Sequence, residues 1–177
     1  MEKRTFLTKS KYESYKKQLE YMEGEGLQLL ATLLGKSPGS GMGRPLDLPI
    51  HDFARQFYSE IELIKSKLKS HIIIDEYIKS IKNKEIIDIG AHVTIYDIDY
   101  KEEESFFILD SDEADPHNNK ISYKSPLGKE LIGKAVGDFV ILEKNSYRGK
   151  ITSLFYKKFN FSYSPRDWKS LLVSLKI

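Results

Sequence analysis

The chain has 177 residues, of which 40% are hydrophobic and 31% are charged, and its formal net charge is +2. Such values are ordinary for one or two small globular domains, and a net charge this small does not predict a surface that coats nucleic acid. The absence of cysteine excludes disulfides, a thiolate nucleophile and cysteine-ligated zinc. The amino terminus lacks the apolar core of a signal peptide and no stretch is long enough to span a bilayer, so a cytoplasmic protein is expected.

The first half has the spacing of two amphipathic helices. From Lys9 to Leu34 apolar residues recur at steps of three and four, and a second such seam runs from Ile50 to Leu68. The first seam consists of Tyr12, Tyr15, Leu19, Met22, Leu29 or Leu30, and Leu33, with Gly26 filling its gap. Between the seams, residues 35–45 hold four glycines and two prolines, through which no helix continues. The sequence therefore predicts an antiparallel helical hairpin, with Thr8 or Ser10 as the first N-cap.

The second half is typical of a small α+β domain with a mostly antiparallel sheet. Its segments are rich in β-branched and aromatic residues, which favour strands, and one short stretch favours helix. Strands are expected at residues 91–99, 101–109, 120–124, 138–142 and 147–156, and one or two helical turns at residues 127–132.

The run from Asp110 to Asp138 contains five short motifs in a fixed order: Asp-Glu-Ala-Asp, Ile-Ser, Ser-Pro-Leu, Leu-Ile-Gly-Lys and Val-Gly-Asp. This run closely resembles the C-terminal signature of the GreA/GreB transcript-cleavage factors, bacterial proteins that act on RNA polymerase through its secondary channel. The resemblance implies an α+β fold, in which an N-terminal antiparallel α-helical coiled-coil hairpin precedes a small FKBP-like domain.

Four segments follow from the periodicity and the resemblance together. Residues 1–75 are expected to form the coiled-coil finger, 76–84 a linker, 85–156 the C-terminal domain and 157–177 an extension that is helical near its end. The last expectation rests on Trp168, Leu171, Leu172 and Leu175, which recur at helical spacing after Ser164-Pro165.

The resemblance also implies a partner and a docking site. A monomer is expected that binds bacterial RNA polymerase and meets nucleic acid only within the transcription complex. It would be an accessory factor rather than an enzyme, with no intrinsic cofactor or metal, and Mg²⁺ would enter only through the polymerase active site. Lys124, Ser125 and Pro126 match the loop through which the family's C-terminal domain meets the polymerase. Pro126 is equally explained as the start of a helix at Leu127, and both roles are compatible.

The predicted fingertip departs from the family pattern. Relatives carry an acidic pair there, in a Gly-Asp-Leu-x-Glu-Asn-Ala-Glu-Tyr type motif, which helps to hold a second Mg²⁺ for RNA hydrolysis. Here the tip has one acid, Asp47, and a cation, Arg44, and the next acid, Asp52, lies five residues on and off the same helical face. Asp47 is a replacement metal ligand or, as we favour, the N-cap of the second helix.

Weak or absent stimulation of cleavage is expected. The alternatives are an active factor that uses Asp47 and an interaction module for another partner.

Two other motifs have simpler explanations than chemistry. Residues 128–135 match most of a phosphate-binding loop but end in alanine instead of the hydroxyl residue that binds Mg²⁺. Residues 112–115 read Asp-Glu-Ala-Asp, which in a chain without a helicase core indicates an acidic turn.

Lysines alternate with aromatic residues from Lys150 to Tyr163. Such a stretch can stack on single-stranded bases. It can also be a strand whose apolar face lies in the core, which is the interpretation we favour.

Overall fold

The computed structural model describes residues 5–36, 48–142, 147–159, 161, 163 and 170. Residue contacts divide this part of the chain into a hairpin unit, within residues 12–70, and a sheet unit made of residues 5–11 and 71–161. The predicted α+β class, with a helical hairpin followed by a sheet domain, is confirmed. None of the described helices is long and apolar enough to cross a membrane.

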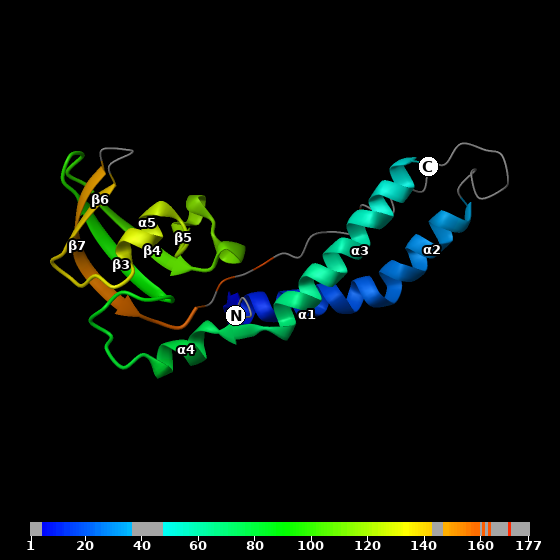
Figure 1. Cartoon of the computed structure of the whole chain (residues 1–177), viewed down its shortest axis with the longest axis horizontal. Helices are drawn as coiled ribbons and strands as arrows, with labels where there is room; N and C mark the ends of the chain where they lie inside the picture. The colour runs from blue at the N-terminus through cyan, green and yellow to red at the C-terminus, as the bar shows by residue number, and fades with distance from the viewer. Residues whose placement is uncertain are drawn as a thin grey trace. The chain divides into compact units, whose positions relative to one another are not determined.

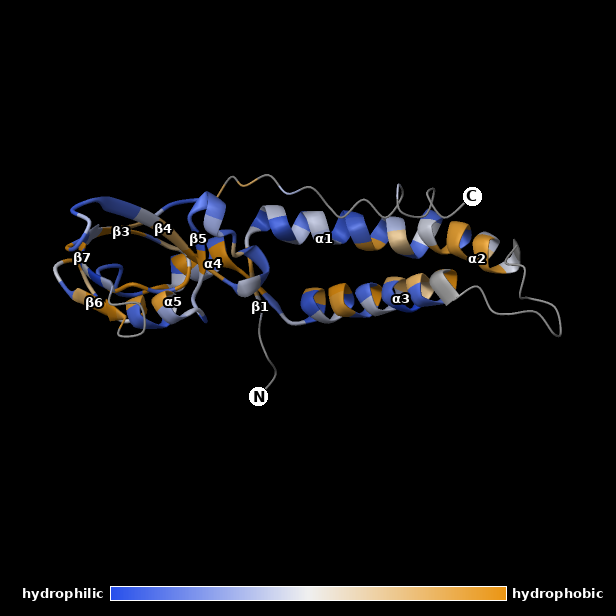
Figure 2. Ribbon diagram, turned by 90° about the horizontal axis from the view of Figure 1, so that it is seen from above, coloured by the Kyte–Doolittle hydropathy of each residue, from blue (hydrophilic) through white to orange (hydrophobic). Residues whose placement is uncertain are grey.

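The hairpin unit consists of two helical arms (Figure 1). The first arm contains α1 (Lys9–Tyr21), a π-helical turn (Met22–Gly26) and α2 (Leu27–Lys36), and the second is α3 (Leu48–Lys69). Figure 2 shows hydrophobic residues concentrated in α2 and repeated along α3. The Nζ atom of Lys65 on α3 lies 2.7 Å from the Glu23 carboxylate, and Lys67 lies 3.3 Å from the hydroxyl of Tyr15. The arms are therefore antiparallel, as predicted.

The buried seam of the first arm departs from the predicted one at Gln18. Gln18 is buried and Leu19 is half-buried, where the periodicity predicted Leu19. Gly26 is buried, and a Cβ placed there would lie 2.8 Å from the ring of Phe57. The glycine therefore lets the two arms approach closely, which agrees with its expected place in the seam.

Two short strands and one short helix belong to the sheet unit, although the sequence predicted their segments as part of the finger or as the linker. Strand β1 (Thr5–Leu7) pairs in parallel with β2 (His71–Ile73), and α4 (Ile74–Ser80) follows directly. Most of α4 falls within residues 76–84, the expected linker. Thr8 is the N-cap of α1, because its Oγ1 accepts a hydrogen bond from the Lys11 N–H at 3.3 Å.

The five-stranded sheet has the order β5-β4-β3-β7-β6. Its elements are β3 (Ala91–Asp97), β4 (Glu103–Leu109), β5 (Lys120–Ser122), α5 (Pro126–Leu131), β6 (Phe139–Leu142) and β7 (Tyr147–Tyr156). All pairs are antiparallel except β4 with β5, which is parallel. The predicted strands are therefore confirmed to within a few residues.

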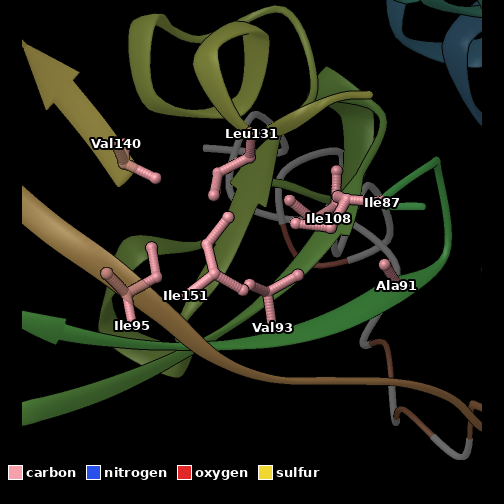
Figure 3. Packing of buried hydrophobic residues seen from close by; sticks show 8 residues of the cluster. All are labelled: Ile87, Ala91, Val93, Ile95, Ile108, Leu131, Val140 and Ile151. Carbon is pink, nitrogen blue, oxygen red and sulfur yellow. The ribbon is translucent and has the colours of Figure 1, made fainter. Parts of the chain in front are cut away.

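The core of the sheet unit lies between α5 and the concave face of the sheet. Its fully buried side chains come from β3, β4, β6, β7, α5 and the segment before β3 (Figure 3). They are Ile87, Ala91, Val93, Ile95, Ile108, Leu131, Val140 and Ile151. Burying side chains of this size stabilises the fold by about 1.5–3 kcal/mol each, so this cluster holds α5 and the loop before it in place.

Candidate functional site

The predicted docking residues lie at the start of α5. Ser125 is the N-cap: its Oγ accepts a hydrogen bond from the Gly128 N–H at 3.0 Å and donates one to the Ser122 carbonyl at 2.7 Å. Pro126 occupies the first helical turn, where its missing N–H costs nothing. The structural explanation of Ser-Pro is thus confirmed, and it fixes the backbone of both residues at the surface.

Lys124 is tied to the fold beneath it. Its Nζ lies 2.7 Å from Oδ1 of Asp110, a carboxylate that is only 4% exposed. Partial burial is the largest single effect and lowers the pKa of the Lys124 ammonium, but the hydrogen bonds and charge interactions with Asp110 and Tyr123 together outweigh it, so the pKa is raised overall. Lys124 therefore stays charged, and its position is set by Asp110 rather than by solvent.

A cleft of about 1030 Å³ opens beside Ser125 and Pro126. Three acids line it, Asp97, Asp99 and Glu104, together with apolar side chains from α5 and β6. The apolar residues are Pro126, Leu127, Ile141 and Leu142. Ile141 is 56% exposed, which leaves an apolar surface next to the acids.

Two polar residues of β7 complete the cleft. The Arg148 guanidinium hydrogen-bonds to Asp99 and holds the pKa of that carboxyl below its ordinary value. Burial, with the nearby charges of Glu104 and Asp97, raises the pKa of Tyr147 to about 12. The buried Tyr147 hydroxyl has no hydrogen-bond partner among the described residues. The cleft is therefore lined by three acids, one of them paired with Arg148, by apolar side chains and by a neutral phenol.

The tip acids and the tail are only partly covered by the described residues. Asp47 and Arg44 lie outside them, as do Trp168, Leu171, Leu172 and Leu175. Asp52 lies in the first turns of α3, exposed and 3.6 Å from the Arg55 guanidinium. Within the described ranges no three histidine, aspartate or glutamate side chains gather as metal ligands would.

Sequence reasoning missed the role of two buried acids. Asp110 accepts a hydrogen bond from the Phe6 N–H at 3.1 Å, and Glu113 accepts two from Thr8, at 2.6 and 2.7 Å. Residues 111–113 form a 3-10 turn, so the predicted acidic turn is confirmed. Local pattern carries no signal for partners about a hundred residues away in the chain.

Comparison with known proteins shows what the sheet unit is similar to. Residues 82–154 match the family model described as transcription elongation factor, GreA/GreB, C-term. Transcription elongation factor GreA of Thermoanaerobacter pseudethanolicus is 47% identical over 83 residues, which are 47% of this chain and 51% of the relative. The GreA of Clostridium botulinum strain Alaska E43 is 43% identical over 77 residues, 44% of this chain and 46% of the relative.

The chain thus spans about half the length of the curated relatives it matches. Among solved structures, the GreA factor homolog 1 protein of Thermus thermophilus is 25% identical, with 86% of this chain and 99% of that chain covered, at a TM-score of 0.37. A TM-score of this size does not establish a common arrangement of the whole chain. The matched residues comprise the Ser125-Pro126 loop and most of the cleft. Residues 82–154 are therefore similar to the C-terminal domain of GreA/GreB transcription elongation factors.

Proposed function

We propose that this protein binds bacterial RNA polymerase and inserts its helical hairpin into the secondary channel, where it alters elongation, pausing or initiation. The observation that carries the proposal is the family match at residues 82–154. The hairpin of α1, α2 and α3 lies outside the matched range and supports the proposal independently. The protein acts as an accessory factor on the polymerase active site and is not itself an enzyme.

The docking surface in this proposal is the α5 end of the cleft. Ser125 and Pro126 form its rim, with Lys124 next to them in the chain. Asp97 and Glu104 give the cleft negative charge, and Asp99 is paired with Arg148. Acids beside an exposed apolar floor complement a partner segment that presents arginine or lysine next to apolar side chains. The partner segment is thus expected to be basic and amphipathic.

A double variant tests this surface. Ser125→Asp with Pro126→Ala should weaken binding to purified RNA polymerase about tenfold or more, because it adds a charge and removes an apolar contact at the rim. Aspartate can accept the Gly128 N–H as serine does, but it loses the hydrogen bond that Ser125 donates to the Ser122 carbonyl, so circular dichroism of the variant checks that the fold is retained. Affinity is measured with the full-length chain by labelled-protein titration.

Asn83→Asp is the matched control for that experiment. It adds the same charge at an exposed position and keeps the acceptor for the Glu85 N–H, so wild-type affinity is expected. Equal binding by the double variant would show that docking uses another surface. No binding by the wild-type chain would overturn the proposed function and favour an interaction module with a different partner.

Weak or absent stimulation of transcript cleavage completes the proposal. A second Mg²⁺ needs more than one added carboxylate, and residues 37–47 supply only Asp47, with Arg44 close by in the sequence. The nearest described acid, Asp52, is already beside Arg55. Occupation of the channel is then the regulatory act, and Mg²⁺ is held by the polymerase alone.

Backtracked elongation complexes provide the measurement. Addition of the purified chain over a range of Mg²⁺ concentrations should release short RNA 3′ fragments no faster than polymerase alone. Binding to the same complexes is measured in parallel, so that inactivity is distinguished from failure to bind. Robust cleavage that is lost in Asp47→Ala would make Asp47 the metal ligand and reverse this part of the proposal. Cleavage that survives the substitution would direct attention to Asp52.

A further inference from the structure

The face of the sheet that points away from the core cluster carries aromatic side chains. Along β3 the buried residues Ala91, Val93 and Ile95 alternate with less buried ones, so His92 and Tyr96 point to the opposite, outer face. Strand pairing then places partners from β4, β6 and β7 beside them in two rows across the sheet.

The first row consists of Phe155, His92 and Phe107, on β7, β3 and β4. The ring centroid of His92 lies 4.3 Å from that of Phe107 and 4.4 Å from that of Phe155. The Nζ atom of Lys157 lies 5.0 Å and 5.4 Å from the centroids of Phe107 and Phe155. Phe155 is 40% exposed, so burial in a core does not account for it. Phe107 packs against a second buried cluster, with the ring centroids of Phe159 and Phe161 at 5.7 Å and 5.3 Å. The accessible part of this row is therefore Phe155, with His92 beside it and the Lys157 cation above it.

The second row consists of Phe139, Lys150 and Tyr96, on β6, β7 and β3. Phe139 is 54% exposed and Tyr96 is 36% exposed, and Lys150 Nζ lies 6.0 Å from the Phe139 ring centroid. Glu103 pairs with Tyr96 on the other side and is the acid at this end. His92 and Tyr96 are four residues apart on one strand, so the rows are separated by about 13 Å.

Hydroxyl groups occupy the outer face between the rows. Thr94 of β3 and Ser105 of β4 are paired, with their Oγ atoms 2.9 Å apart. The face therefore combines stacking surfaces, hydrogen-bonding groups and two exposed lysines, Lys150 and Lys157, against one acid. A purely apolar protein partner would leave these lysines and hydroxyls desolvated without compensation.

We propose that this outer face, defined by Phe155, His92, Phe139, Tyr96 and the lysines Lys150 and Lys157, binds single-stranded nucleic acid. Unpaired bases stack on aromatic side chains of an open sheet, and phosphates are neutralised by lysines placed among the rings. The lysines attract a polyanion, and the aromatic rings favour a polyanion that carries flat bases. The proposal is independent of the proposed function, because the face shares no residue with the Ser125-Pro126 rim and is tested without polymerase.

The test is a fluorescence-anisotropy titration of the full-length chain into a labelled oligouridine of about 12 nucleotides, within the site sizes of single-strand binders. Saturable, salt-dependent binding is expected. Phe155→Leu keeps an apolar side chain but removes the ring, and should weaken binding about tenfold. Lys157→Gln should reduce the slope of log affinity against log salt by about 0.7, which is the value for one phosphate contact on a single strand.

Lys129→Gln is the matched control, because it removes one exposed positive charge from α5 and leaves the outer face unchanged. Its affinity and salt slope should equal those of the wild type. Phe139→Leu, on the second row, provides an independent variant should Phe155→Leu prove unstable by thermal denaturation. Absence of saturable binding, or wild-type affinity in both ring variants, would overturn the proposal. Equal competition by polyglutamate would overturn it as well, because it would show a general polyanion surface without base stacking.

Discussion

Replacement of Gly128 by alanine is expected to lower the free energy of unfolding of the sheet unit by about 3 kcal/mol or more. Gly128 is buried in α5, and an added Cβ would overlap the Ser122 carbonyl oxygen and lie 2.8 Å from the Tyr123 Cα atom. Both atoms belong to the backbone, so no rotation of a side chain can relieve the overlap. Urea unfolding of the full chain, followed by circular dichroism, measures the change.

The loss should extend from stability to docking. The added methyl group would push away the backbone at Ser122. Because the Ser122 carbonyl accepts a hydrogen bond from the Ser125 hydroxyl, this movement would also displace the N-cap of α5. Polymerase affinity of Gly128→Ala should therefore fall as well, even at temperatures where the variant is folded.

Gly24→Ala is the control for Gly128→Ala. Gly24 is helical and has no atom within 4 Å of an added Cβ. Alanine there should leave stability unchanged or raise it by up to about 1 kcal/mol, because glycine is a poor helix former. Equal stability of wild type and Gly128→Ala would show that the Ser122 loop can shift at little cost, contrary to the packing described above.

The role of Gly128 illustrates what the sequence could and could not predict. The match of residues 128–135 to part of a phosphate-binding loop was rejected for lack of a hydroxyl residue, yet nothing in the pattern pointed to the contact with Ser122. The contact joins α5 to the end of β5, and such tertiary approach is invisible to local spacing. By contrast, the helix start at Pro126 follows a local rule and was predicted, whereas the cap by Ser125 was not.

The same distinction holds for the fold. Alternation and helical spacing predicted the hairpin and the five-stranded sheet, because each element buries one face of its own sequence. β1, β2 and α4 were missed, since strands of three residues and a helix of seven are too short for a periodic signal. Gln18 is buried in place of Leu19, which the spacing of apolar residues could not show because Gln18 is polar. The domain boundaries, the tip acids and the tail helix remain predictions.

Replacement of Glu113 by alanine is expected to destabilise the sheet unit by about 3 kcal/mol and to release the N-terminal strand. Glu113 is 2% exposed and Thr8 is fully buried. The two carboxylate oxygens accept hydrogen bonds from the N–H and the hydroxyl of Thr8, at 2.6 Å and 2.7 Å. Without the carboxylate both donors are buried and unpaired, and each such group costs about 1–3 kcal/mol.

Hydrogen exchange separates this local effect from global unfolding. In Glu113→Ala, the amides of β1 and of the first turn of α1 should lose protection before those of β3, because Thr8 both ends the strand segment and caps the helix. Thr8→Val removes the hydroxyl, and with it both the hydrogen bond to Glu113 and the cap of α1, and should cost about 2 kcal/mol or more. Glu102→Ala, at an exposed position, should cost nothing measurable. If the two substitutions at positions 8 and 113 proved additive in a double-mutant cycle, their hydrogen bonds would contribute no coupling energy. Strong coupling would instead show that Glu113 holds β1 in place through Thr8, although the two residues are 105 positions apart in the chain. Such a role requires a carboxylate at position 113, because both of its oxygens accept hydrogen bonds from Thr8.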